Sequence, residues 1–386
     1  MKTFGMLQVI FPIIVLLLGV HVVSQYPAVD ALVPVSRPSR DLNRYTRRIQ
    51  ATVRRRTTPL RMSSLLRYEE PVFRPPAEWR SLILQVTIGC SWNKCSFCEM
   101  YQDKQFRAKS LADIQAELEL VSANNGRGDV VRDVFLADGD AISLPTKQLL
   151  GILQLVQEYF PNVRRISSYC LPRNIYYKSV EDLLELKQAG LSLVYVGCES
   201  GDNDVLNAIQ KGETYDTSLE QLTKLQEAGI KRSIMILLGL GGKLYSEQHA
   251  IASAKLASAS QPEFLSVLTT SFPRGLDRIE EGYQQHLLLK NRQAAPNNVA
   301  DSSTPTPAFE PLTARESLRE LQLLLQHTDI KTNKTVFRSD HASNYLVLKG
   351  RLGRDKDKLL QQVTSVLEAP EEEDVYNLRP EWARGL

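Results

Sequence analysis

Cysteine is scarce in this chain: there are five among 386 residues, which is also an odd number. That count excludes a small scaffold held together by disulfide bonds. Glycine (20) and proline (19) occur at ordinary frequencies, which excludes collagen-like and low-complexity chains. With 43% hydrophobic residues, the chain is too apolar to be disordered throughout, and it is long enough for one large domain or two small ones.

Acidic residues are nearly missing from the first 62 residues. This segment holds ten Lys or Arg, and its only acids are Asp30 and Asp41, so its net charge is +8. Because the whole chain has a formal charge of +3, the remaining 324 residues carry −5. A mildly acidic body argues against non-specific binding of nucleic acid by the folded part of the chain.

The N-terminal segment has the composition of a targeting leader. Residues 9–23 form an apolar run, shorter than the about 20 residues of a membrane span, that matches the core of a signal peptide. Residues 32–62 are rich in Arg, Ser, Thr and Pro, as organelle transit peptides are. Together they resemble the bipartite leaders of algal plastids with additional membranes, so residues 1–62 predict a plastid protein whose mature form does not span a membrane. The alternative is a signal anchor followed by a basic stem, in the secretory pathway or anchored to a membrane.

From about residue 80, short apolar segments alternate with amphipathic ones. The apolar segments are typical of strands buried on both faces of a parallel sheet: 82–88, 131–137, 165–169, 193–198, 232–238 and 264–269. The segments between them have helical spacing: 111–123, 146–160, 180–189, 219–228 and 247–257. This βαβ alternation predicts an α/β fold. We expect a partial (β/α)6 barrel over residues 80–275, although a doubly wound sheet is also compatible.

Beyond the sixth expected strand the pattern changes. Residues 276–310 end in a polar, turn-rich stretch and predict a flexible insert or linker. Residues 311–386 predict a C-terminal extension with helices at about 313–327 and 356–368 and a compact polar motif at 334–358. From Pro370 onward, four consecutive acidic residues predict a loose tail.

Three of the five cysteines lie together directly after the first expected strand. Cys90, Cys95 and Cys98 have the spacing C-x4-C-x2-C, and three thiolates packed so closely form a site for a soft metal. Because no fourth cysteine is near, the three suit a [4Fe–4S] cluster with one open iron. Loops at the carboxyl ends of strands carry the chemistry of parallel barrels, and this loop is in that position.

Other interpretations of the three cysteines stay open at this point. With a distant fourth cysteine, the spacing also matches plant-type [2Fe–2S] ferredoxins, so an iron–sulfur electron-transfer protein is the alternative. Against it, the chain is far longer than a ferredoxin. A structural zinc site needs a fourth ligand, and none of the five histidines is near in sequence. Buried, unreactive cysteines usually occur singly.

Over about residues 80–275 the sequence resembles the radical S-adenosylmethionine (SAM) superfamily, whose commonest motif, C-x3-C-x2-C, has one residue fewer in its first gap. The resemblance implies that the three cysteines bind a [4Fe–4S] cluster. Asp138 to Asp140 resemble the family's turn for the amino group of SAM, and Glu199 lies in a segment resembling the one that approaches its ribose and carboxylate. The implied SAM-binding residues are Phe97, Asp138, Gly139, Asp140, Glu199, Ser200, Gly239 and Gly241.

The resemblance further implies an enzyme that cleaves SAM reductively to a 5′-deoxyadenosyl radical, which takes a hydrogen atom from a substrate. An external one-electron donor is then required, and ferredoxin is the natural choice in a plastid. A non-catalytic descendant that retains the cluster is a third hypothesis. The substrate is not readable from the sequence. We favour a small molecule or a protein over nucleic acid, because the body is acidic and no RNA-binding module is evident.

Four residues are candidates for contact with the substrate. Arg173 and Arg274 follow the third and sixth expected strands, and guanidinium groups match carboxylates and phosphates. Cys170 ends the third strand and could be a thiol on the substrate side. His341, in the 334–358 motif, could donate or accept a proton. Arg338 in the same motif has either a structural or a substrate-binding role.

Overall fold

The computed structural model describes residues 66–124, 131–294 and 309–385. The chain divides into two compact units between Arg56 and Thr57, and every described residue belongs to the second unit, Thr57–Leu386. The expected leader, residues 1–62, lies outside the described residues. None of the helices in the described ranges is both long and apolar enough to cross a membrane.

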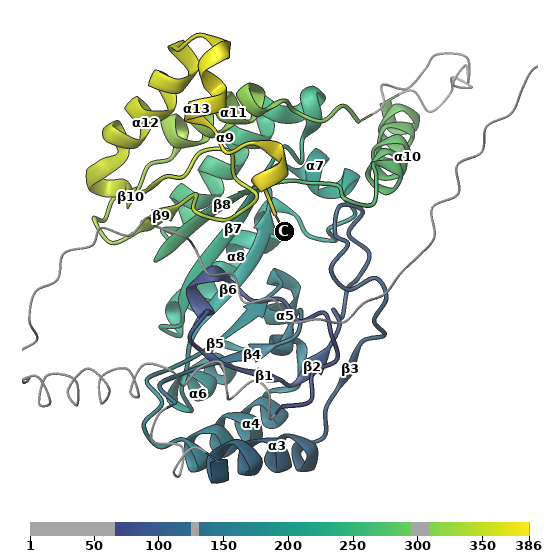
Figure 1. Ribbon diagram of the computed structural model, residues 1–386. Helices are drawn as coiled ribbons and strands as arrows, with labels where there is room; N and C mark the ends of the chain where they lie inside the picture. The colour runs from purple at the N-terminus through teal and green to yellow at the C-terminus, as the bar shows by residue number, and fades with distance from the viewer. Residues whose placement is uncertain (1–65, 125–130, 295–308, 386) are drawn as a thin grey trace, which may run out of the picture. The chain divides into compact units, whose positions relative to one another are not determined.

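The second unit is built on one eight-stranded sheet (Figure 1). Its strands, in spatial order, are β1 (Leu82–Gln85), β4 (Asp133–Ala137), β5 (Arg165–Cys170), β6 (Leu191–Glu199), β7 (Lys231–Leu238), β8 (Phe264–Thr269), β9 (Val336–Arg338) and β10 (Lys349–Arg351). All neighbours pair in parallel except β9 and β10. The expected α/β fold is therefore confirmed. The sheet is open, with β1 and β10 at its edges, as in a partial barrel.

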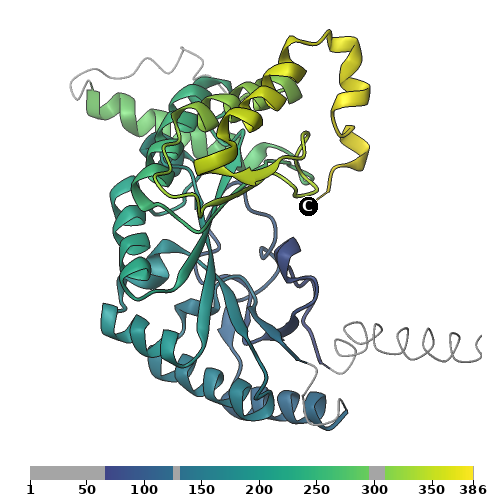
Figure 2. The ribbon, with the colours of Figure 1, turned by 90° about the vertical axis from the view of Figure 1, so that its left-hand side faces the viewer.

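Helices cover one face of this sheet (Figure 2). They include α3 (Leu111–Asn124), α4 (Thr146–Tyr159), α6 (Val180–Gln188), α8 (Tyr215–Glu227), α9 (Gly242–Ser260), α11 (Ala314–His327) and α12 (Leu352–Glu368). Three of them begin at a hydroxyl cap: Ser179, Thr214 and Thr313 each accept a hydrogen bond from a backbone N–H in the first turn. Each expected strand and helix of the core is present, with shifted ends.

The other face of the sheet is lined by a smaller cluster that includes Ile83, Phe135 and Tyr195. The segment around η2 (Pro76–Glu78) lies on this inner face (Figure 2). Glu78 is fully buried there and accepts hydrogen bonds from Tyr195 Oη at 2.6 Å and Ser167 Oγ at 3.0 Å. Arg165 Nη2 lies 2.9 Å from its other carboxylate oxygen. One carboxylate therefore fastens the N-terminal segment to two strands.

The expected first strand, 82–88, is split into two. β1 stays in the main sheet, whereas β2 (Thr87–Ile88) pairs with β3 (Arg107–Ala108) in a separate two-stranded sheet. Val86 N still donates to Ala137 O at 2.7 Å, so the chain leaves the main sheet only after β4 has ended. The cysteine segment thus becomes a long loop between β2 and β3.

The expectation of a flexible insert over 276–310 is wrong for its first half. Residues Asp277–Ala294 form the helix α10, which packs against the short helix α7 (Asn203–Ala208). Ile279 and Tyr283 are buried in this contact, and Tyr283 Oη donates to Leu240 O. Apolar side chains at helical spacing outweigh the polar composition of the stretch. Residues 295–308 lie outside the described residues.

The expectation of a loose acidic tail is also wrong. The segment after α12 forms short helical turns, including α13 (Asp374–Asn377), and Arg315 on α11 holds Asp374 in an ion pair of 2.8 Å. Arg379 donates to three backbone carbonyls between His341 and Asn344. Arginine donors, which the acidic composition hides, fix the tail to the 334–358 motif.

Replacing Glu78 with alanine tests the role of this buried carboxylate. Glu78→Ala leaves Tyr195 Oη, Ser167 Oγ and Arg165 without their acceptor, so we expect the free energy of unfolding to fall by at least about 2 kcal/mol. Urea denaturation followed by circular dichroism measures the loss. Glu78→Gln keeps the acceptor oxygen and should lose less. An alanine variant as stable as the parent would contradict the assignment.

Candidate active site

The cysteine loop lies against the carboxyl ends of the strands and is held from two sides. Ser96 N donates to Ile209 O and Trp92 Nε1 donates to Gln210 O, both at 2.9 Å, which fastens the loop to the end of α7. Arg278 on α10 donates to the carbonyls of Cys98 and Cys95 at 2.7 and 3.0 Å. The loop backbone is therefore fixed by contacts that do not use the thiols.

The three thiols are gathered in a largely buried environment. Burial, followed by the charge of Asp140, raises the pKa of Cys90 to about 11, and burial raises the pKa of Cys95 to about 12. Burial likewise raises the pKa of Cys98. Each group would be a neutral thiol unless a cation compensates it, and thiolate ligation to a metal provides that compensation. Within the described ranges, no three His, Cys, Asp or Glu side chains are grouped closely enough for one metal ion. A cluster differs because each thiolate binds its own iron.

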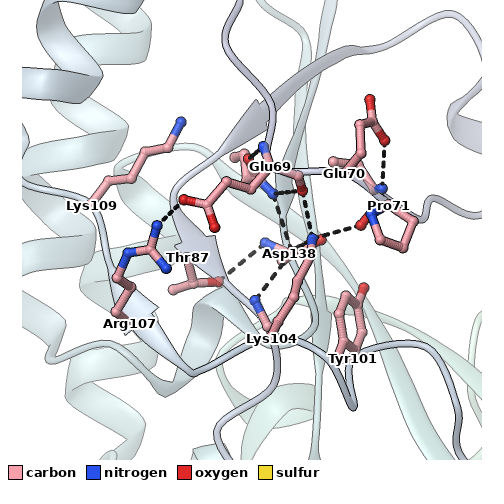
Figure 3. Close-up of polar contacts among 12 residues, drawn as sticks. Glu69, Glu70, Pro71, Thr87, Tyr101, Lys104, Arg107, Lys109 and Asp138 are labelled. Carbon is pink, nitrogen blue, oxygen red and sulfur yellow. Dashed lines mark hydrogen bonds and ion pairs between the residues drawn. The ribbon is translucent and has the colours of Figure 1, made fainter.

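Asp138, directly after β4, ties the loop to the sheet (Figure 3). Its Oδ2 accepts hydrogen bonds from Gly89 N and Gln85 Nε2, both at 3.1 Å. Lys104 Nζ lies 2.8 Å from the same oxygen and also donates to the carbonyls of Glu69 and Pro71. The second oxygen, Oδ1, is buried and has no hydrogen-bond partner among the described residues.

Asp140, two residues further on, holds the start of the cysteine loop. Its carboxylate accepts from Ser91 N at 3.0 and 3.1 Å and from Ser91 Oγ. Burial raises the pKa of Asp140 to about 6, although the bonds from Ser91 oppose the shift. Both aspartates therefore contact the backbone next to Cys90, which their sequence motif did not indicate.

Gly139 allows this turn and the loop to approach each other. A Cβ at this position would lie 2.8 Å from Tyr101 Cε2, 3.0 Å from Gly89 O and 3.1 Å from Cys90 Cβ. Gly139 N donates to Gly89 O at 3.1 Å, so the two backbones are in direct contact. Glycine is required here for space.

Glu199 and Lys211 form a buried ion pair at the end of β6. Lys211 Nζ lies 3.1 Å from Glu199 Oε1, and the lysine side chain is 2% exposed. Burial alone would lower the pKa of Lys211, but Glu199 and Cys95 raise it overall, so the group is a cation. The sequence did not mark Lys211 as functional. The signal in the sequence that could have indicated a role for Lys211 was its position, twelve residues after Glu199 in the turn before Gly212.

Ser200 and Gly239 are linked by a buried network that includes the C-terminal extension. Ser200 Oγ lies 2.7 Å from His249 Nδ1, and His249 Nε2 lies 3.7 Å from Glu320 Oε1. Glu320, on α11, accepts a hydrogen bond of 2.7 Å from Gly239 N. The side chain of Ser200 is thus occupied within the protein. Helix α11 supports two of the strand ends that the resemblance assigns to SAM.

The two remaining expected SAM residues differ in their surroundings. Phe97 is partly buried and packs against a cluster that includes Leu240, which follows β7, and Tyr283 on α10. Gly241 precedes the first turn of α9, where a Cβ would lie 2.8 Å from the backbone of Tyr245.

The four substrate-side candidates are not brought together. Arg173 stacks on Trp92 with its guanidinium carbon 3.6 Å from the ring centroid, and Arg274 is an exposed residue paired with Asp103 at 2.8 Å. Cys170 is buried in the core between the sheet and the helices, away from the inner face.

His341 lines a cavity of about 130 Å³ on the inner face, between the η2 segment and β9. We call this space the inner cavity. Its other lining residues include Tyr169, Tyr195, Met235, Phe264 and Arg338.

Comparison with protein families agrees with this geometry. Residues 84–253 match the model of the radical SAM superfamily, a segment that runs from β1 into α9 and contains the cysteine loop, the Asp138 turn and Glu199. This segment is a radical SAM superfamily domain. The superfamily typically uses a [4Fe–4S] cluster and SAM as cofactors. A domain of this family therefore implies reductive cleavage of SAM at such a cluster. The family was thus predicted from the sequence alone.

Individual relatives are distant. The chain is 22% identical over 176 residues to the heme chaperone HemW of Bacillus subtilis, a match that covers 45% of this chain and 46% of that protein. It therefore spans about half the length of the curated relative that it matches. Among solved structures, the radical SAM methyltransferase TsrM from Kitasatospora setae has a TM-score of 0.46 at 16% identity, over 78% of this chain and 61% of that one. Coproporphyrinogen III oxidase HemN from Escherichia coli has a TM-score of 0.41 at 17% identity, over 61% and 55%.

The residues present fit the cofactors that the superfamily uses. Three thiols on one fixed loop supply three ligands, and the charges of Cys95, Cys98 and Cys90 influence one another. Asp138 Oδ1, buried without a partner, is an acceptor suited to an ammonium group. Lys211 places a buried cation beside Cys95, where it offsets the negative charge of thiolate ligands.

A glycine substitution tests the close contact between the turn and the loop. In Gly139→Ala the added methyl group must push Gly89 or Cys90 away, so we expect iron content after reconstitution to fall severalfold. Gly151→Ala in α4 is the matched control, since its methyl group meets only the flexible Leu111 side chain and should leave iron content unchanged. Iron and sulfide analysis of both proteins is the measurement. Equal iron content would contradict the spatial requirement.

Proposed function

We propose that this protein is a radical SAM enzyme that acts on a small molecule held in the inner cavity. Cys90, Cys95 and Cys98 would hold the [4Fe–4S] cluster. When bound, the reduced cluster and SAM supply a 5′-deoxyadenosyl radical that takes hydrogen from an unactivated C–H bond. The observation that carries the proposal is the fixed cysteine loop facing the Asp138 turn and the Glu199–Lys211 pair.

The chain's own residues position and shield this reaction. Asp138 would accept the ammonium group of SAM on its free oxygen, while Lys104 and Gly89 N hold the other oxygen in place. Glu199 is kept beside Gly197, where a Cβ would lie 2.3 Å from its carboxylate, and Lys211 fixes its orientation. Burial of Cys95 and Lys211 keeps water from the centre, which protects a reactive radical.

The remaining assignments extend this proposal beyond the site. A reduced cluster needs a one-electron donor, and we propose ferredoxin if residues 1–62 direct the protein to a plastid. The mature protein would then not span a membrane. The composition of the leader supports these assignments.

Spectroscopy with and without SAM tests the proposed function. The full chain is reconstituted with iron and sulfide without oxygen and reduced with dithionite. We expect an electron paramagnetic resonance signal of [4Fe–4S]⁺ that changes when SAM is added, together with formation of 5′-deoxyadenosine. A [2Fe–2S] signal indifferent to SAM would overturn the proposal in favour of an electron-transfer protein.

Two cysteine variants separate cluster ligands from packed thiols. Cys95→Ala removes a ligand and should abolish both the cluster absorbance and SAM cleavage. Cys170→Ala is the matched control, because Cys170 lies in the core on the helix side and should retain the cluster. The outcome is measured by iron analysis and by absorbance at about 400 nm, where thiolate-bound iron–sulfur clusters absorb. Normal SAM cleavage by Cys95→Ala would refute the ligand assignment.

A further inference from the structure

The inner cavity carries more positive charge than its surroundings compensate. Arg74, Arg165 and Arg338 all line it. Arg165 is already paired with Glu78 at 2.9 Å. The side chains of the other two make no hydrogen bond or ion pair with any residue in the described ranges. Arg74 and the one acid on the lining, Asp340, are both exposed.

Arg338 is the more notable of the two unpaired arginines. It ends β9, and its Nε is buried without a hydrogen-bond partner among the residues that the structure describes. Its guanidinium carbon lies 5.8 Å from the ring centroid of Phe264, which is a weak contact for a cation. A buried N–H donor left unpaired costs free energy, so a ligand acceptor at this position would be favoured.

His341 adds a second donor to the same lining. Ser343 N donates to His341 Nδ1 at 3.1 Å, so Nδ1 is an acceptor and the neutral ring carries its proton on Nε2. Arg379 and Arg384 donate to backbone carbonyls of residues 341–344 and hold this loop in position. The loop that carries His341 is therefore fixed before any ligand binds.

Apart from Ser233 and Ser266, the rest of the lining is apolar or aromatic. Leu193, Met235, Phe264 and Leu268 contribute to it, and Tyr169 and Tyr195 add ring faces. At about 130 Å³, the cavity is close to the engineered cavity of about 150 Å³ that binds benzene. A body of roughly six carbon atoms is of suitable size.

We propose that the inner cavity binds an organic anion with a small apolar body and a carboxylate or phosphate end, anchored by Arg338 with Arg74 and His341. This inference rests on the proposed function, since it names the substrate class of that enzyme. The guanidinium group favours these two end groups because its donors match their paired oxygens. The apolar walls take the carbon chain.

Four probes with the same six-carbon body test the proposal: hexanoate, hexyl phosphate, hexan-1-ol and hexylamine. Binding to the reconstituted full chain is measured by isothermal titration calorimetry. We expect hexanoate, hexyl phosphate or both to bind about tenfold or more tightly than the alcohol and the amine. Preference for one anion identifies the end group. Equal binding of hexanoate and hexan-1-ol, or binding of none of the four, overturns the proposal.

Three arginine variants locate the anchor. Arg338→Met should weaken anion binding about tenfold, and Arg338→Lys should restore part of it. Arg319→Met is the matched control, since Arg319 is exposed on α11 outside the cavity lining, and it should bind like the parent. Circular dichroism checks that each variant is folded. Unchanged binding in folded Arg338→Met refutes Arg338 as the anchor.

The same preparations distinguish this inference from the function on which it rests. Each is also assayed for the cluster signal and for 5′-deoxyadenosine. Anion binding without SAM cleavage would leave the cavity assignment standing and overturn the proposed function. SAM cleavage without anion preference would overturn the cavity assignment alone.

Discussion

The buried ion pair between Lys104 and Asp138 is the interaction on which the site depends. It joins the end of the cysteine loop to the end of β4, and the same carboxylate oxygen accepts from Gly89 N at the start of the loop. One oxygen thus closes a loop of sixteen residues, Gly89 to Lys104, at both ends. Because the pair is buried, water does not screen it, and its loss would leave an uncompensated charge.

A second constraint follows from the parallel sheet. Parallel strands end at the same edge, so residues far apart in the sequence, such as Asp138, Glu199 and Gly239, meet around the cysteine loop. Two helices fix this edge of the sheet: α10 holds the cysteine loop through Arg278, and α11 holds Gly239 after β7 through Glu320. The C-terminal extension is therefore a structural part of the site, although it lies outside the segment that matches the family.

The inner face of the sheet carries the proposed substrate side of the site. Glu78 fills one part of it and fastens the N-terminal segment across β5 and β6. The end of β9, with Arg338, and the loop after it, with His341, form another part of the wall. The 334–358 motif, whose role the sequence left open, thus lines the inner cavity and adds two strands, β9 and β10, to the sheet.

The sequence by itself determined the α/β fold, the order of the core elements and the family, because these rest on local periodicity and on closely spaced motifs. Only the tertiary structure decided how Asp138 and Asp140 are used, that Lys211 pairs with Glu199, and that Arg274 lies at the surface while His341 lines the cavity. It also corrected the insert, where α10 packs through Ile279 and Tyr283, and the tail, which Arg379 anchors. Each of these depends on contacts between distant parts of the chain, and composition averaged over a segment does not report such contacts.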